Sequence, residues 1–153
     1  MEEMELLRQI FFLKDLSTGE LIKLNILAEK ASFKEGETIA EEGSPGDCIY
    51  IIRAGSVRVM KGATHVHTLN AGEPVGEMSF MDRSPRSATL VAASDVALIC
   101  ISAEHLEKVL ELDKALAYKI HRSIIAFLSK RLREANECLK IVPDYIRNLT
   151  GEN

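Results

Sequence analysis

The sequence predicts an α+β domain in which an antiparallel β-roll or jelly-roll barrel is flanked by N-terminal helices and a long C-terminal helix. Three segments carry this prediction, because apolar residues recur at helical spacing over 1–31, in short runs over 32–102, and at helical spacing again over 103–142. Glycines punctuate the middle segment, as turns between antiparallel strands require. With 153 residues, 46% of them hydrophobic, the chain is expected to form one domain with a buried core.

The N-terminal segment, 1–31, is predicted to be helical. Ser17 and Glu20 have the spacing of a capping box at a helix start. The apolar residues that follow share one helical face: Leu21, Leu24, Leu27 and Ala28. Such a face indicates packing against the core, and no chemistry is expected from this part of the chain.

The middle segment, 32–102, is predicted to form the barrel. Its β-branched runs are short, such as Ile49 to Ile52 and Val96 to Ile101, and Gly, Pro, Asn and Asp residues separate them. Turn signals at this pace favour antiparallel strands over alternating βαβ units. The apolar runs also fall far short of the roughly 20 residues that a membrane-spanning helix needs, so a soluble protein is expected.

The C-terminal segment, 103–142, is predicted to contain a short helix capped by Ser102 and a long helix from about Asp113 to Lys140. Pro143 is expected to stop the long helix. An apolar stripe follows this helix: Leu116, Ala117, Ile120, Ile124, Phe127, Leu128, Leu132, Ala135 and Leu139. Because the stripe is broader than a half-exposed helix needs, it predicts a homodimer along the helix.

Charge content disfavours a nucleic-acid-binding protein. The formal net charge is −4, whereas proteins that bind polyanions usually carry a basic surface. Basic residues are in excess only near the C-terminus, at Lys130, Arg131 and Arg133, and two glutamates follow at once. A solvated helix face is therefore favoured over a nucleic-acid surface.

The N-terminus and the cysteines predict a cytoplasmic protein. The first five residues, Met1 to Glu5, are acidic where a secretory leader needs a basic region, so no export is expected. The three cysteines, Cys48, Cys100 and Cys138, are an odd number at wide spacing, which fits a reducing compartment better than a disulfide framework.

The segment over 72–89 combines residues that suit an anion. Gly76 is placed to open a short helix whose free backbone N–H groups can face a ligand. Pro85 restricts the backbone so that Arg86 can fold back over the helix start as a bidentate partner for phosphate. Glu77 offers an acceptor to a ribose hydroxyl, so the pair points to a nucleotide. On chemistry alone, a structural ion pair between Glu77 and Arg86 is an equally good interpretation.

The run over 76–89 resembles the phosphate-binding cassette of the cyclic nucleotide-binding domain family, which includes the bacterial catabolite activator protein and the regulatory subunits of cyclic-AMP-dependent protein kinase. The usual cassette has Gly-Glu-apolar-Ala-Leu, a short insert and Pro-Arg-x-Ala-Thr. This chain has Gly76-Glu77-Met78-Ser79-Phe80 and then Pro85-Arg86-Ser87-Ala88-Thr89. A second family pattern lies upstream, from Phe33 to Val57, and includes Gly43-x-x-Gly46-Asp47. Ser79 in place of Ala and Val75 in place of Phe are mild departures.

The resemblance implies that cyclic AMP or cyclic GMP is the ligand, with no other cofactor. Arg86 would bind the exocyclic phosphate oxygens, with help from the backbone N–H and the hydroxyl of Ser87. Glu77 and the backbone of Gly76 would hold the ribose 2′-OH. Further backbone N–H groups would come from Met78 and Ser79.

The resemblance also implies where the base of the nucleotide lies. Val57 and Val59 are on the strand that, by similarity, passes the base, and apolar contact there would tolerate either purine. Asn136 on the long helix is at about the place from which the catabolite activator protein contacts the base. Ser87 does not decide between adenine and guanine, because related proteins use this position for either.

The expected function is a non-catalytic regulatory module that moves its C-terminal helix on binding a cyclic nucleotide and acts on an effector protein that the sequence does not name. It would involve neither nucleic acid nor membrane. Two alternatives remain open: a ligand-independent interaction or dimerisation module on the same fold, and the regulatory fragment of a longer transcription regulator.

A metal enzyme is disfavoured. The His65-x-His67 pair on a predicted strand is how cupins begin their metal set, and an alternating strand would put both rings on one face. A cupin also needs a nearby Glu and a later His on another strand, and this sequence places neither.

Overall fold

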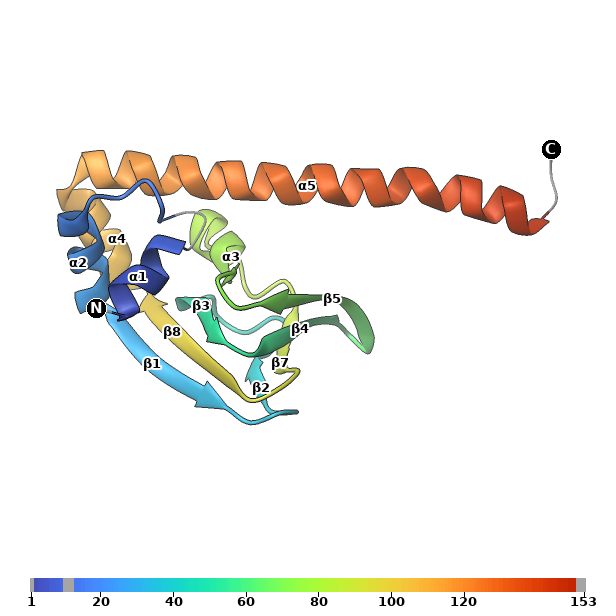
Figure 1. The fold of residues 1–153 in the computed structure, drawn as a ribbon, viewed down its shortest axis with the longest axis horizontal. Coiled ribbons are helices and arrows are strands. Elements are labelled where there is room, and N and C mark those ends of the chain that lie inside the picture. The colour runs from blue at the N-terminus through green and yellow to red at the C-terminus, as the bar shows by residue number, and fades with distance from the viewer. Residues whose placement is uncertain (1, 10–12, 151–153) are drawn as a thin grey trace.

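A computed structural model describes residues 2–9 and 13–150 of the chain, and it confirms the predicted α+β class. The helices are α1 (Glu2–Gln9), α2 (Thr18–Ile26), α3 (Glu77–Asp82), α4 (Ala103–Leu112) and α5 (Lys114–Thr150). The strands are β1 (Ala28–Phe33), β2 (Thr38–Ala40), β3 (Cys48–Ala54), β4 (Ser56–Lys61), β5 (Thr64–Asn70), β6 (Pro74–Val75), β7 (Thr89–Ala92) and β8 (Val96–Ser102). Figure 1 shows α1, α2 and α4 at one end of the roll, with α5 running across it and projecting beyond.

The strands form two four-stranded antiparallel sheets, with orders β1-β8-β3-β6 and β2-β7-β4-β5. Side chains of the first sheet alternate between two cores. Ile99 and Ile101 of β8 pack in the core that also contains α2, α4 and α5, whereas Val96 and Leu98 pack between the sheets. This period of two is the one that a strand buried on both faces requires.

The N-terminal helical segment ends earlier than the sequence predicts. The capping box is present, since the Glu20 carboxylate accepts from the Ser17 N–H at 2.7 Å, and α2 stops at Ile26. Ala28, expected on the helical face, instead begins β1, which pairs with β8 from Ala28 opposite Ile101 to Phe33 opposite Val96. Pairing along a whole strand overrides a local helical pattern.

The C-terminal helices begin as predicted, but the long one continues further. Ser102 caps α4, and the Asp113 carboxylate accepts from the Leu116 N–H at 3.0 Å at the start of α5. The expected stop at Pro143 is wrong, because α5 runs to Thr150. A proline removes one backbone donor at a cost of roughly 3 kcal/mol, but the helical hydrogen bonds on either side of it remain.

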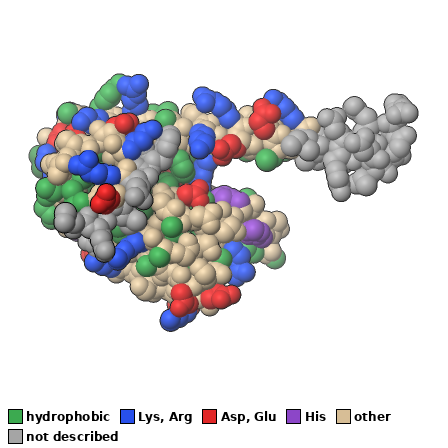
Figure 2. Space-filling model, in the orientation of Figure 1, with side chains coloured by type: hydrophobic (Ala, Val, Ile, Leu, Met, Phe, Trp, Pro, Cys, Tyr) green, Lys and Arg blue, Asp and Glu red, His purple; other side chains and the backbone are tan. Residues whose placement is uncertain are grey.

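The two halves of α5 differ in burial. Leu116, Ile120 and Ile124 are fully buried against the domain, whereas Leu132 and Leu139 are 63% and 66% exposed. Figure 2 shows the described part of the projecting half with Lys, Arg, Asp and Glu side chains along it. None of the helices in the described ranges is both long and apolar enough to cross a membrane.

Candidate functional site

A pocket of about 370 Å³ lies among β4, β5, the turn from β6 into α3 and the segment before β7, and α5 reaches over it. Seven of the residues singled out by the sequence line this pocket: Val59, Gly76, Glu77, Met78, Ser79, Arg86 and Ser87. Much of the remaining wall is apolar and comes from Val66, Leu69, Val75, Ala88 and Leu90. The fold therefore brings the two ends of the 76–89 segment together around one cavity.

The backbone at Arg86 is fixed from two sides. Its N–H donates to the Ser44 carbonyl at 2.8 Å, and its carbonyl accepts from the Gly43 N–H at 2.8 Å. The Ser79 hydroxyl of α3 donates to the Pro85 carbonyl at 3.4 Å. The loop before β3 and the helix α3 thus determine where the guanidinium enters the pocket.

The Arg86 guanidinium is a buried cation with spare donors. Only 3% of the side chain is exposed, Nη2 donates to the Cys48 carbonyl, and the group lies 5.1 Å from the centre of the Tyr50 ring. Its one ion pair within the described residues, with the exposed Asp47, is 3.9 Å long, and Nε and Nη1 make no hydrogen bond there. Buried unpaired donors on a charged group are costly, so this geometry suits an anionic ligand.

Gly76 lies where the two ends of the segment meet. Its φ of +88° is in the left-handed region, and a Cβ at this position would overlap Nη1 of Arg86. Glycine therefore permits both the turn into α3 and the close approach of the guanidinium. The predicted helix start is confirmed, with Gly76 as the N-cap of α3.

Glu77, the first residue of α3, is buried, with 2% of its surface exposed. Its Oε1 accepts a hydrogen bond from Nη1 of Arg131 at 2.8 Å, which joins α3 to α5. Burial raises the pKa of Glu77, while Arg131 acts in the opposite direction. The ion pair that Glu77 makes within the described chain is therefore with Arg131, and not with Arg86 as the structural interpretation of the sequence had it.

Arg131 is the site residue that the sequence interpretation missed. The basic pattern around it predicts a solvated helix face, whereas only 26% of its side chain is exposed and it closes the pocket over Glu77. Its guanidinium also stacks 4.7 Å from the centre of the Phe127 ring. Helical spacing could have found it, because Arg131 lies four residues after Phe127 and seven after Ile124, on the buried side of α5.

Two predicted base contacts lie outside the pocket in this arrangement. Val57 is 1% exposed and packs in the core between the sheets, while Val59, two residues along β4, does line the pocket. Asn136 is exposed on the projecting half of α5 and does not line the pocket.

The two strand histidines do not present one common face. Val59 is opposite His67 and Met60 is opposite His65, so Val66 is an extra residue in a β-bulge of β5. His67 and Val66 line the pocket, and Nε2 of His65 instead lies 3.0 Å from the Thr68 hydroxyl. In the part of the chain that the structure describes, no group of three His, Cys, Asp or Glu side chains is placed to hold a metal ion.

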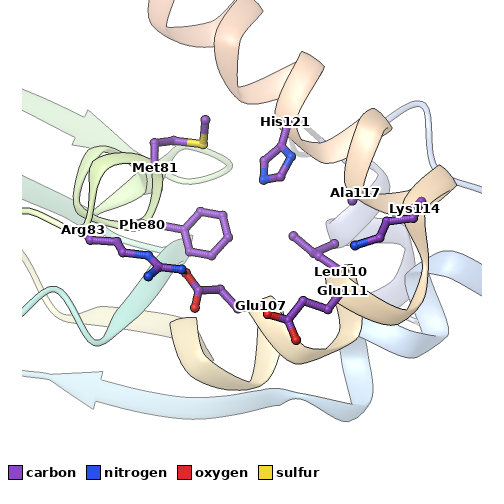
Figure 3. A pocket seen from close by; sticks show the side chains of 9 residues that line it. All are labelled: Phe80, Met81, Arg83, Glu107, Leu110, Glu111, Lys114, Ala117 and His121. Atoms are coloured by element: carbon purple, nitrogen blue, oxygen red, sulfur yellow. The ribbon is translucent and has the colours of Figure 1, made fainter.

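The opposite side of α3 borders a second cavity, of about 440 Å³, between α3, α4 and α5. Figure 3 shows Phe80 facing this cavity from α3 and His121 facing it from α5, and the two ring centres are 6.4 Å apart. Arg83, just after α3, pairs with Glu107 of α4 at 3.3 Å. The helix α3 thus contacts the first pocket on one side and the C-terminal helices on the other.

Comparison with known proteins identifies relatives of this chain. Residues 30–113 match the sequence profile of the family described as the cyclic nucleotide-binding domain. The cAMP-dependent protein kinase regulatory subunit of Debaryomyces hansenii is 41% identical over 71 residues, which are 46% of this chain and 16% of that protein. The cGMP-dependent protein kinase of Toxoplasma gondii is 29% identical over 109 residues, which are 71% of this chain and 11% of that protein.

A solved structure supports the same relationship. A cyclic nucleotide-binding domain from Methylobacillus flagellatus superposes with a TM-score of 0.83 at 26% sequence identity, over 94% of this chain and 84% of that one. Against the two kinase-system relatives, by contrast, the chain spans less than a fifth of their length.

Proposed function

The chain belongs to the cyclic nucleotide-binding domain family, and from this premise we propose that it is a non-catalytic regulatory module that binds cyclic AMP or cyclic GMP. The single observation that carries the proposal is the buried Arg86 guanidinium, whose Nε and Nη1 have no hydrogen-bond partner within the described residues. Both free N–H groups of the buried cation can donate to an anionic ligand such as a phosphate, and the surrounding wall is largely apolar, as a nucleotide pocket requires.

The roles of the remaining residues follow from their places around Arg86. The exocyclic phosphate oxygens would accept from Arg86 and from the backbone N–H and hydroxyl of Ser87, with backbone N–H groups of Met78 and Ser79 nearby. Glu77 and the backbone of Gly76 would receive the ribose 2′-OH. The base would lie along β4 against Val59, with the buried Val57 supporting this strand from the core, and apolar contact there serves adenine and guanine alike.

Ligand binding would be communicated through Arg131. The Glu77 carboxylate that a ribose hydroxyl would use already accepts from Arg131 of α5. A ribose hydroxyl at Glu77 would compete with Arg131 for this carboxylate. The ligand would therefore bind more tightly when Arg131 and α5 have moved away than when they are in place, and a ligand-driven switch requires such a difference in affinity. The projecting half of α5 would then move and act on an effector protein in the cytoplasm.

A second copy of the chain would pair along α5. Four large hydrophobic residues of α5 are exposed and recur every seven residues: Tyr118, Ile125, Leu132 and Leu139. A seven-residue repeat is the pattern of a left-handed coiled coil, and in a parallel pair Asn136 of one copy would face Arg131 of the other. This arrangement would bring Asn136 to the site from the second chain.

Light scattering tests the pairing. We expect the wild-type chain to be a dimer and Leu132→Asp to be a monomer, because a charge in the seam is desolvated without a partner. Arg133→Ala, one residue away and outside the seam, is the matched control and should remain dimeric. A wild-type monomer at all concentrations, with and without nucleotide, would remove the dimer from the proposal.

The exposed seam also favours the alternative function, a dimerisation module that needs no nucleotide. Thermal unfolding with millimolar cyclic AMP, cyclic GMP or 5′-AMP separates the two functions. After unfolding and refolding to remove any carried-over nucleotide, we expect one cyclic nucleotide to raise Tm by several degrees and 5′-AMP not to do so. No shift with any of the three would support the ligand-independent module.

A further inference from the structure

His67 on β5 contacts the ion pair that joins α5 to the pocket. Its Nε2 lies 3.4 Å from Nη2 of Arg131, whose Nη1 donates to Glu77 at 2.8 Å. A guanidinium can only donate hydrogen bonds, so His67 must accept at Nε2 and carry its proton at Nδ1. The contact therefore requires a neutral imidazole.

We propose that His67 is a positioning residue for the nucleotide site: as a neutral acceptor it holds Arg131 on Glu77, and its protonation releases Arg131 and the adjoining part of α5. The effect of this release on nucleotide binding rests on the proposed function, because it requires a ribose hydroxyl that binds to Glu77. The positioning of Arg131 by His67 does not depend on any ligand.

The charged and titratable groups around His67 come from α5, from β5 and the turn after it, and from α3. The groups that face it are Arg131 from α5, Glu73 from the turn after β5, His65 from its own strand, and, through Arg131, Glu77 from α3. Lys61 of β4 lines the same pocket, but Glu42 holds its ammonium at 2.6 Å. Burial and Arg131 lower the pKa of His67, against a smaller opposing effect of Glu73.

The sign of the effect follows from these contacts. At neutral pH the imidazole is uncharged and accepts from Arg131. Below the lowered pKa of His67, a proton at Nε2 removes the acceptor and places two cations side by side, which weakens the hold on Arg131. Glu77 then becomes available to a ribose hydroxyl, so acidification should tighten cyclic nucleotide binding.

Two variants of His67 separate positioning from packing, and a variant of Arg131 provides a third test. His67→Gln places an amide oxygen near the position of Nε2 and cannot titrate, so it should rescue the contact at every pH. His67→Leu keeps the bulk and has no acceptor, so it should mimic the acidified wild type. Arg131→Gln removes the cation, and the pKa of His67 should rise in this variant.

The first measurement needs no ligand. NMR titration of the imidazole, assigned by the signal missing from His67→Gln, is expected to give a pKa that rises in Arg131→Gln. Amide exchange over residues 124–135, corrected for intrinsic rates, should speed up about threefold between pH 7.5 and 5.5 in the wild type and stay constant in His67→Gln. Identical pH profiles for wild type and His67→Gln would overturn the proposal.

The second measurement is calorimetric affinity for cyclic AMP and cyclic GMP over the same pH range. We expect the wild type to bind about threefold tighter at the lower pH and His67→Gln to show no such gain. A gain of equal size in both proteins would overturn the effect of His67 on the site. If neither nucleotide binds at any pH while acid still loosens α5 in wild type alone, the proposed function fails and the positioning role of His67 stands.

Discussion

The 76–89 segment buries its functional charged side chains, whereas the helix α5 carries charged pairs at its surface. In the segment, Glu77 and Arg86 are almost fully buried and their positions are fixed by backbone turns and by Gly76. On α5, the ion pairs Lys130 with Glu134 and Lys140 with Glu137 lie at the surface. Surface pairs of this kind contribute about 0–1 kcal/mol, whereas buried charges without full partners cost more.

From this difference we expect the 76–89 segment to bind the ligand and α5 to be the part that moves. The segment is held on both sides by backbone hydrogen bonds, while α5 is packed from Leu116 to Phe127 and its described side chains over 132–140 are exposed. The ion pair of Glu77 with Arg131 joins the two regions beside the pocket, and Phe80 packs against His121 of α5 on the other side of α3. A change on either side of this pair should therefore affect one region strongly and the other weakly.

The largest effect is expected from Arg86→Ala. Removing the cation should weaken cyclic nucleotide binding by at least roughly 2 kcal/mol, about thirtyfold, because a desolvated phosphate loses its charged partner. The free energy of unfolding should not fall, since the variant also removes a buried, incompletely paired charge. Calorimetry and urea unfolding measure the two quantities.

Arg83→Ala is the matched control for this variant. Arg83 precedes Arg86 by three residues, 80% of its side chain is exposed, and it pairs with Glu107 outside the pocket. Its removal should leave the affinity unchanged. Equal affinity of wild type and Arg86→Ala would disprove the site and leave the fold untouched.

The next effect tests the close approach at Gly76. Gly76→Ala should lower affinity about tenfold more than Gly72→Ala, because the new methyl group displaces the guanidinium of Arg86. Gly72 is the control, since its φ of +89° gives a similar backbone penalty while a Cβ there meets nothing within 4 Å. If both variants bind the nucleotide with equal affinity, backbone strain alone explains the loss of affinity, and the overlap with Arg86 does not contribute to it.

The third effect concerns the junction itself. Arg131→Gln leaves the buried Glu77 without its ion-pair partner and should cost about 1 kcal/mol of unfolding free energy, less than for a fully buried pair because Arg131 is partly exposed. The double variant with Glu77→Gln should recover most of this loss. Urea unfolding of the four proteins gives the coupling, and additive losses would show that the pair does not join the two regions.

Nucleotide affinity provides a second test of the ion pair between Glu77 and Arg131. Arg131→Gln frees Glu77 from its competitor, so it should bind cyclic nucleotide more tightly even though it is less stable. Glu77→Gln should bind more weakly and discriminate less against a 2′-deoxy ligand. A variant that loses stability and affinity together at position 131 would mean that Arg131 assists the ligand and does not compete with it.

The sequence predicts the fold and much of the pocket because both depend on local patterns. Period-two runs, glycine turns and the capping box at Ser17 are readable from neighbouring residues, and so is the turn at Gly76. One prediction failed where distant contacts decide, because the pairing of β1 with β8 turned Ala28 into strand. The expected stop at Pro143 failed for a local reason, since the loss of one backbone donor did not end α5. Arg131 was missed because its partner, Glu77, lies 54 residues earlier in the chain.

The smallest effect is expected where the packed half of α5 meets α2. Glu20 accepts from the Ser17 N–H and from the Lys119 ammonium at 2.9 Å, and these two contacts, in that order, lower the pKa of Glu20. A carboxyl pKa that is lower in the folded than in the unfolded chain stabilises the fold at pH values above the ordinary pKa of glutamic acid. This stabilisation is lost as the pH falls through the pKa of the folded state.

Glu20→Gln should therefore lower the free energy of unfolding by at most about 1 kcal/mol at pH 7, and by progressively less as the pH falls towards 3. Urea unfolding across this range measures the difference, with Glu104→Gln, on an exposed pair with Lys108, as the control. Nucleotide affinity should stay at the wild-type value, because the packed half of α5 is held by many apolar contacts besides Glu20. A fall in affinity would mean that both halves of α5 move on binding, and the division at Arg131 would have to be abandoned.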